Sequence, residues 1–333
     1  MKKAALYSAV LAALMSGSTL AATVYKADGT ELKLGGRAEF RGDFNAAEDG
    51  QEIDGTMKNK SRVRVNVGGN TQITDALSGF AFYEAEQSVK SSGDNDANTS
   101  FKQRYMYAGL AGDFGAFSMG KQDTANVQLS QMTDIATFTG KQKEFINAGD
   151  EQINNNFFYA YNMDALSLQA NYIAGEEKDT DGYGVSGIYT LPFGLGLGLG
   201  YAANDNGVGN GSANQFTAGA NYELDALYLA ATYTMGDIDD KANTEFNGLE
   251  VAAQYKLTSA FRLIAAYSKQ EVENKNSNTK ADIHDFFELT GRYDFNKSIR
   301  GYLSYKLNQM KAEDTGYGKD ADDTIRLGLR YDF

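Results

Sequence analysis

The chain has 333 residues, a net charge of −13, no cysteine, no tryptophan and a single proline. The acidic balance disfavours a nucleic-acid-binding protein, because phosphate backbones require patches of lysine and arginine. Without cysteine, disulfides cannot hold the fold together. Tyrosine outnumbers phenylalanine by 21 to 19, and glycine reaches 36 residues. This composition favours a wet interior with aromatic belts over one large dry core.

Residues 1–21 are expected to form a secretory signal peptide. Two lysines precede an apolar run over residues 4–15, and the small-x-small sequence Thr-Leu-Ala follows at 19–21. The run is too short for a membrane-spanning helix, and no later segment approaches the roughly 20 apolar residues that such a helix needs. We treat residues 22–333 as one domain, and any membrane crossing in it must use strands.

The segment ELKLGGRAEFRGDF, residues 31–44, alternates strictly between apolar and polar side chains. This period of two is typical of a β-strand. Leu32 and Phe40 fall on one face of the predicted strand, and Arg37 and Arg41 fall on the other. A soluble sheet would turn the apolar face inward, whereas a barrel in a bilayer turns it toward lipid and lines a water-filled bore with the charges.

The same alternation recurs to the final residue. The predicted strands are residues 31–44, 56–69, 77–88, 100–110, 114–121, 154–163, 166–172, 183–191, 194–203, 214–224, 227–233, 249–255, 261–267, 287–295, 299–307 and 325–333. Sixteen is an even number, as a closed single-chain barrel requires, and short connections alternate with long acidic ones. We therefore predict an all-β fold, a 16-stranded antiparallel transmembrane β-barrel. Tyrosines on the apolar face are expected to form a belt at each membrane interface.

One connection is much longer than the rest. It runs from the strand that ends near Lys121 to the strand that begins near Asn154, and a connection of roughly 30 residues without alternation usually has a function. A second unusual stretch is GLGLGLG at 194–200, whose leucines are expected to face lipid. Its glycines permit a close approach to the inner wall, for which the long connection is the candidate.

Five stretches of the sequence carry a resemblance to a known family. They are ATVYKADGTELKLGGRAEF at 22–40, SRVRVNVGGNTQI at 61–73, RYMYAGLAGDFGAFSMGK at 104–121, QMTD at 131–134 and GLRYDF at 328–333. Together they resemble the trimeric general-diffusion porins of Gram-negative outer membranes, and most closely the OmpU-like porins of vibrios and their marine relatives. The resemblance implies a homotrimer of 16-stranded barrels, each with a long third loop folded into the lumen. It implies passive transport of ions and small hydrophilic solutes across the cell outer membrane.

The resemblance also implies the residues of a constriction. We expect its basic ladder to consist of Arg37, Arg64 and Arg104, and its acidic side of Asp134, Asp123 and Glu144. Arg37 and Arg64 also fall on the polar parity of their predicted strands. Cations and anions that face each other across a narrow water-filled gap produce a transverse field, which orients dipolar solutes and biases the passage of ions.

Other positions follow from the same parity and resemblance. The remaining lumen-wall residues are Glu39, Arg41, Arg326 and Arg330, and Tyr331 and Phe333 belong to a terminal strand that resembles the signal read by the barrel assembly machinery. Two features depart from the family. Gln152 stands where the family often has a further arginine, and IATFTG follows QMTD in place of a Pro-Glu-Phe-Gly-Gly run.

The charges and loops of the sequence also predict an ion preference and contacts with partners. Acidic mouths predict a mild preference for cations, and acidic loops such as 46–55 and 313–323 are candidates for weak divalent bridging to lipopolysaccharide. Residues 88–100 are expected to contact the neighbouring subunit, as in relatives. No cofactor and no dedicated metal site are predicted.

A solute-specific channel and a surface adhesin or structural barrel remain the alternatives. The lumen aromatics Phe80, Phe82 and Tyr302 are scattered in the sequence, which favours the general pore over a sugar-specific one. An enzyme is disfavoured because His284 is the only histidine.

Overall fold

The computed structural model describes residues 21–44, 56–89, 101–315 and 320–333. Nearly all of the predicted signal peptide lies outside these residues. The acidic loop at 46–55 and most of the predicted subunit contact at 88–100 also lie outside them. In the described part of the chain, no helix is long and apolar enough to cross a membrane.

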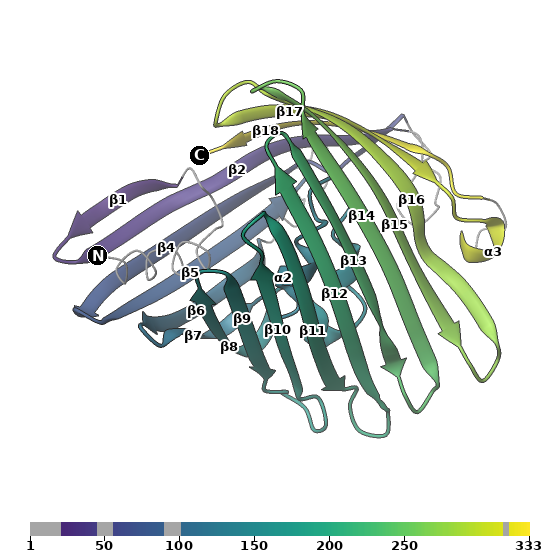
Figure 1. Cartoon of the computed structure of the whole chain (residues 1–333), viewed down its shortest axis with the longest axis horizontal. Helices are drawn as coiled ribbons and strands as arrows, with labels where there is room; N and C mark the ends of the chain where they lie inside the picture. Colours follow the sequence, from purple (N-terminus) through teal and green to yellow (C-terminus); the bar gives the residue numbers. More distant parts are fainter. Residues whose placement is uncertain (1–20, 45–55, 90–100, 316–319) are drawn as a thin grey trace.

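Within the described residues, sixteen antiparallel strands form a closed ring (Figure 1). They are β2 (Thr30–Phe44), β4 (Arg62–Thr74), β5 (Leu77–Ser88), β6 (Lys102–Gly112), β7 (Gly115–Gln122), β8 (Ile153–Met163), β9 (Leu166–Ile173), β10 (Gly182–Thr190), β11 (Leu195–Asp205), β12 (Ser212–Leu224), β13 (Leu227–Asp239), β14 (Thr244–Lys256), β15 (Phe261–Asn274), β16 (Thr279–Asp294), β17 (Ile299–Asn308) and β18 (Thr324–Asp332). Each strand pairs with its neighbour in the chain, and β18 pairs with β2 to close the ring. The predicted 16-stranded antiparallel barrel is confirmed.

The ring closes where the two ends of the chain meet. Two backbone hydrogen bonds join Gly36 and Phe333, with N···O distances of 2.8 and 3.0 Å. The short strand β1 (Ala22–Ala27) pairs with the beginning of β2, at residues 30–34. The short strand β3 (Met57–Asn59) pairs with the end of β2, at residues 42–44. A Cβ atom on Gly36 would clash with the backbone carbonyl oxygen of Arg64 on β4 and lie 2.7 Å from Cζ of Phe333, so a larger residue here would force the wall to shift.

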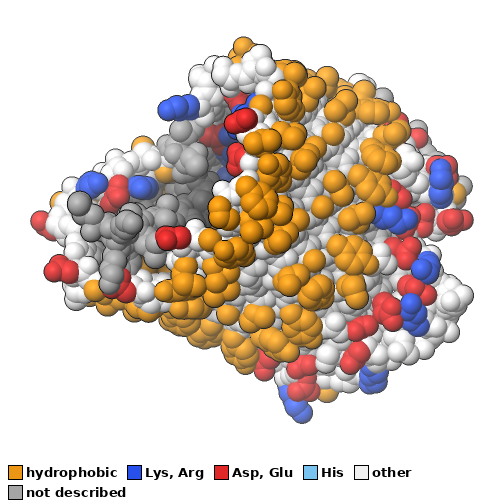
Figure 2. Space-filling model, viewed as in Figure 1, with side chains coloured by type: hydrophobic (Ala, Val, Ile, Leu, Met, Phe, Trp, Pro, Cys, Tyr) orange, Lys and Arg blue, Asp and Glu red, His pale blue; other side chains and the backbone are white. Residues whose placement is uncertain are grey.

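The two faces of the wall have the predicted orientation. Leu32 and Phe40 lie on the outer face and are 38% and 43% exposed, whereas Glu39 on the same strand is buried on the inner face. In Figure 2 hydrophobic side chains cover the wall and charged side chains gather at the ends of the strands. Tyr255 and Tyr331 are exposed one residue before the ends of β14 and β18, as an interfacial belt requires.

Strand boundaries differ from the prediction where polar residues continue a strand. The strand predicted at 56–69 is observed at 62–74, and the segment predicted at 261–267 continues to residue 274. Lys275, next to that strand end, forms ion pairs with Glu245 and Glu273, at 3.1 and 2.8 Å. Backbone pairing therefore extends beyond the apolar band that the prediction was based on.

The connection between β7 and β8, residues 123–152, lies against the inner face of the wall. Helices in the described residues are short: α2 (Val127–Ser130), η2 (Lys141–Lys143), η3 (Asn147–Gly149) and α3 (Ala312–Thr315), the first three of them in this connection. Leu129 of α2 is buried with Met132 and Ala230. A Cβ on Gly200 of β11 would lie 2.7 Å from Cδ1 of Leu129. The close approach expected at the glycines of GLGLGLG is therefore present.

Candidate functional site

Glu250 of β14 binds the middle of segment 123–152. This side chain is fully buried, and its Oε1 accepts hydrogen bonds from Oγ1 of Thr133 at 2.6 Å and from the backbone N–H of Gly140 at 2.9 Å. A buried carboxylate is stable only when its oxygens have such partners. The contact therefore fixes the segment to the wall.

Glu288 and Arg326 bind the sequence IATFTG, residues 135–140, which departs from the family pattern. Glu288 of β16 accepts hydrogen bonds from the backbone N–H groups of Thr137 and Phe138, both at 2.9 Å. Nη1 of Arg326 donates to the carbonyl oxygen of Thr137 at 2.6 Å, and its guanidinium lies 3.7 Å from the ring centre of Phe138. Two charged side chains of opposite sign thus hold this stretch.

A cavity of about 370 Å³ lies on the other side of the segment. Its lining residues are Arg37, Arg64, Phe82, Glu84, Arg104, Tyr105, Tyr107, Gln122, Asp123, Thr124, Val127, Gln128, Gln131, Phe158, Gln169 and Arg330. The three arginines of the predicted basic ladder line one cavity together with Arg330 and with Asp123 of the segment. The wall residues come from β2, β4, β5, β6, β7, β8, β9 and β18, which follow one another around the ring.

Two of the ladder arginines have carboxylate partners. Nε of Arg104 lies 2.8 Å from Oε1 of Glu84, and its Nη2 lies 3.9 Å from Oε1 of Glu151. Arg64 pairs with Glu86 and lies 3.7 Å from Glu84. Paired in this way, both guanidinium groups are held in fixed positions by the wall.

Arg37 differs from the other two. It stands directly opposite Arg64 in the register of β2 and β4. Its Nε atom is buried without a hydrogen-bond partner among the described residues. On the other side its cross-strand neighbour is Asp332, but that carboxylate pairs with Arg300 and Arg330, at 2.5 Å each. Like charges directly opposite each other destabilise a sheet, and within the described residues Arg37 has no carboxylate in direct contact to offset this.

The three predicted acidic residues are not equivalent. Asp123 lines the cavity, where its Oδ1 accepts hydrogen bonds from the Tyr105 hydroxyl at 3.0 Å and from the backbone N–H of Gln152 at 3.1 Å. Asp134 and Glu144 do not line it. They pair with Lys143 at 3.2 Å and Lys141 at 2.9 Å, both in the same segment.

Burial sets the charge of these groups. It raises the pKa of Asp123 to about 6, with the neighbouring Glu151 adding to the effect. Burial alone would also raise the pKa of Glu151, but Lys143 and Arg104 outweigh it and hold that pKa below its ordinary value. At neutral pH the segment therefore presents two carboxylates toward the arginine wall, and Asp123 is the one that becomes neutral first on acidification.

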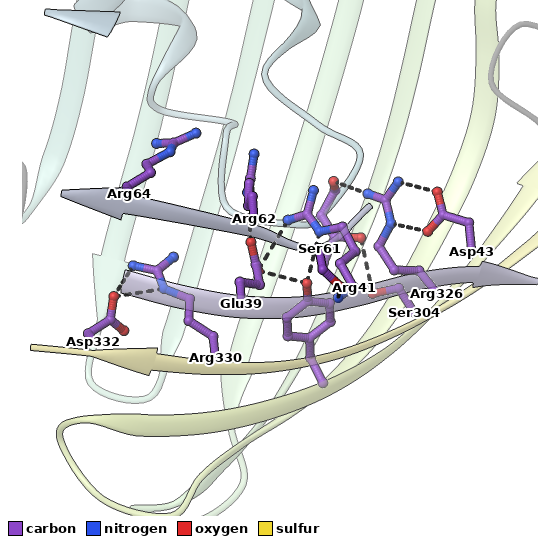
Figure 3. A network of polar contacts seen from close by, with 12 residues as sticks. Glu39, Arg41, Asp43, Ser61, Arg62, Arg64, Ser304, Arg326, Arg330 and Asp332 are labelled. Atoms are coloured by element: carbon purple, nitrogen blue, oxygen red, sulfur yellow. Dashed lines mark hydrogen bonds and ion pairs between the residues drawn. The ribbon is translucent and has the colours of Figure 1, made fainter. Parts of the chain in front are cut away.

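The other predicted wall residues form a second network (Figure 3). Glu39 accepts from Nε of Arg62 at 2.9 Å and from the Tyr302 hydroxyl at 2.8 Å, while Arg41 lies 3.3 Å from Glu39. Arg326 forms a bidentate pair with Asp43, at 2.6 and 2.8 Å. Apart from Arg330, these residues do not line the cavity.

Sequence reasoning missed several residues of the cavity. Glu84 lies on the lumen-facing side of the predicted strand 77–88, so the alternation in the sequence could have identified it. Tyr105 was hidden by a register shift at Glu84 and Ala85, which turns the adjacent Arg104 and Tyr105 to the same side. Gln152, which stands where relatives often have an arginine, does not line the cavity; its backbone N–H donates to Asp123 and its side-chain amide to Glu151.

The expectation of scattered lumen aromatics was incomplete. Phe80 and Phe82 pack with Tyr107, at ring-centre distances of 6.4 and 5.6 Å, and Phe82 lies 6.1 Å from Tyr105. These four residues, the aromatic cluster, come from β5 and β6 and adjoin the arginines of the cavity. Tyr302 stands apart from them, in the Glu39 network.

Comparisons with known proteins agree with this architecture. A family model described as Gram-negative porin matches residues 8–333. Outer membrane protein U of Vibrio parahaemolyticus is 33% identical over 361 residues, and porin-like protein L of Photobacterium profundum is 32% identical over 354 residues. Both alignments cover the whole of each chain.

Solved structures show the same fold. OmpF of Salmonella typhi, determined in a complex with daunomycin, has a TM-score of 0.80 at 21% identity, and the match covers 94% of this chain and all of that one. OmpT of Vibrio cholerae in its trimer form has a TM-score of 0.71 at 19% identity, with 92% and 100% coverage. The chain therefore belongs to the Gram-negative porin family, whose members are channels rather than enzymes, and it is a general-diffusion porin of the outer membrane.

Proposed function

We propose that segment 123–152 narrows the pore and that its cavity-facing side is the constriction. One observation carries this: Arg37, Arg64 and Arg104 line the same cavity as Asp123, which extends from the segment. Anchoring by Glu250 and Glu288 on the far wall keeps the segment close to the arginines. Solutes that cross the barrel pass between the two.

The constriction imposes a transverse field on solutes in transit. The guanidinium groups of the wall face Asp123 and Glu151, and a gap lined by opposite charges orients dipolar molecules. Asp134 and Glu144 are paired with lysines of the segment and add little net field there. We assign their role to holding the segment in shape.

Ion selectivity is proposed to be mild and cationic. The chain carries a net charge of −13, which raises the concentration of cations near the mouths. The arginines of the cavity act against this preference. Neutralising them therefore makes the pore more selective for cations.

The experiment is single-channel recording in planar bilayers under a salt gradient, with Arg37→Gln, Arg64→Gln and Arg104→Gln combined. We expect the wild-type zero-current potential to have the sign of a cation-selective pore. The variant should have a larger potential of the same sign. An unchanged potential in the variant would contradict the assigned roles. Silence from correctly folded, inserted wild-type protein would instead indicate a plugged barrel, and would favour the adhesin or structural reading.

Assembly and export are part of the proposal. OmpT, a structural relative, has a trimer form, and we propose a homotrimer that conducts in steps of three. The barrel assembly machinery would read the last strand, where Tyr331 is exposed and Phe333 completes the closure. Lipopolysaccharide is the proposed contact of the acidic loops. Cleavage after residue 21 is checked by the mass of the mature protein.

A further inference from the structure

We propose that the cavity is a binding site for a small hydroxylated anion of the sugar-acid class, with its carboxylate on Arg37. This inference deepens the proposed constriction and rests on it. General diffusion requires no such site, so retention of one chemical class would be an additional property of this pore.

The first support is the state of Arg37. Within the described part of the chain, its guanidinium makes no hydrogen bond and no ion pair, and its Nε is buried. Leaving a buried donor unsatisfied is unfavourable, and more so for a charged group. The wall arginines Arg64, Arg104 and Arg330 are each paired with a carboxylate. An anion that enters the cavity therefore finds one guanidinium available.

The second support is a pair of neutral polar groups that also lack partners. The side chains of Gln131 and Gln169 line the cavity, the first exposed and the second half-buried, and neither makes a side-chain hydrogen bond within the described part of the chain. An amide group can both donate and accept. The two amides suit a ligand with several hydroxyl groups.

The third support is the limited apolar surface. Phe82, Tyr107 and Phe158 line the cavity but are only 6%, 8% and 5% exposed. Their faces are covered by other side chains, so they offer little area for stacking a ligand ring. This favours a polar, hydroxylated anion over an aromatic one. The volume of about 370 Å³ falls in the range of roughly 300–1,000 Å³ that is typical of small-molecule sites.

The test uses three probes that separate the charge from the hydroxyl groups. Glucuronate carries the charge and the hydroxyls, glucose carries only the hydroxyls, and benzoate carries only the charge on an aromatic ring. Each is titrated against the potassium chloride current of the wild-type pore in planar bilayers. We expect glucuronate to reduce the current at a concentration about tenfold lower than glucose, the effect expected of one charge-assisted hydrogen bond. Benzoate is expected to block the current more weakly than glucuronate does.

Variants separate the site from the general charge of the pore. Arg37→Gln is expected to raise the half-blocking concentration of glucuronate about tenfold and leave that of glucose unchanged, and Arg37→Lys to restore part of the effect. Arg262→Gln is the matched control, because Arg262 faces the inside of the barrel, pairs with Asp294 at 2.5 Å and lies outside the cavity. This variant should keep the half-blocking concentrations of all three probes within about twofold of the wild-type values.

Failure of this inference is distinguishable from failure of the proposed constriction. An open pore that glucuronate blocks no better than glucose, or an Arg37→Gln pore blocked as well as wild type, would overturn the sugar-acid site alone. A stronger block by benzoate would overturn the hydroxylated class. If the wild-type pore were silent, calorimetric titration of glucuronate into the detergent-solubilised protein would still decide whether the site exists.

Discussion

The two sides of the barrel interior treat their charges differently. On the wall of β14 and β16, Glu250 and Glu288 are buried and saturated with hydrogen bonds from segment 123–152. On the wall of β2 and β4, Arg37 has no hydrogen-bond or ion-pair partner in the described residues, whereas Arg64 at the same cavity is paired with Glu86. Saturated charges hold structure, whereas unsatisfied ones are available to solutes. Position in the ring, and not residue type alone, decides which role a lumen charge has.

The largest expected effect comes from breaking the saturated wall. Glu250→Ala with Glu288→Ala leaves the N–H groups of Gly140 and Thr137 without acceptors, and each loss costs about 1–3 kcal/mol. We expect noisy channels of altered conductance and a lower unfolding temperature, measured by single-channel recording and by gel mobility after heating. Glu245→Ala at the strand end is the control. Quiet, wild-type currents from the double variant would show that the segment is held by other contacts.

A smaller effect is expected at the seam between α2 and β11. Gly200→Ala places a Cβ 2.7 Å from Cδ1 of Leu129, so the segment or the strand must shift, at a cost of about 1–3 kcal/mol for such overpacking. A shift toward the arginine wall should lower the conductance. Gly291→Ala is the control, because its Cβ would lie 3.6 Å from the nearest atom. A fall in conductance of equal size in both variants would speak against this seam.

The smallest effect is a dependence on pH. The pKa of Asp123 is raised to about 6 by burial, so this carboxyl is charged at pH 7.5 and neutral at pH 5. The loss of that negative charge from the segment should reduce cation selectivity as the pH falls through 6. Asp150, whose pKa burial also raises to about 6, does not line the cavity and should contribute less.

The variant Asp123→Asn distinguishes the titration of Asp123 from that of Asp150. At pH 7.5 this variant should have the zero-current potential that the wild type has at pH 5, with little further change on acidification. A step in the variant as large as that of the wild type would assign the titration to Asp150 or another group.

Much of the fold was predictable because each strand carries its own evidence. Alternation is a local property, and it located β5 to the residue and oriented Arg37 and Leu32 correctly. The pairing of Thr133 with Glu250 was not predictable, because 117 positions separate them and no local pattern relates them. The register shift that brings Tyr105 beside Arg104 likewise depends on the neighbouring strand. Parity thus predicts the face of a residue, and only the closed ring determines its partner.

Thiol modification tests the constriction most directly, because the chain has no cysteine to interfere. Gln131 of segment 123–152 lines the cavity, whereas Lys275 directly follows the end of β15 and lies outside the cavity. A bulky thiol reagent applied to Gln131→Cys should remove more than half of the single-channel conductance, while the same reagent at Lys275→Cys should change it little. Unchanged conductance in a fully labelled Gln131→Cys protein would mean that solutes do not pass between the segment and the arginine wall.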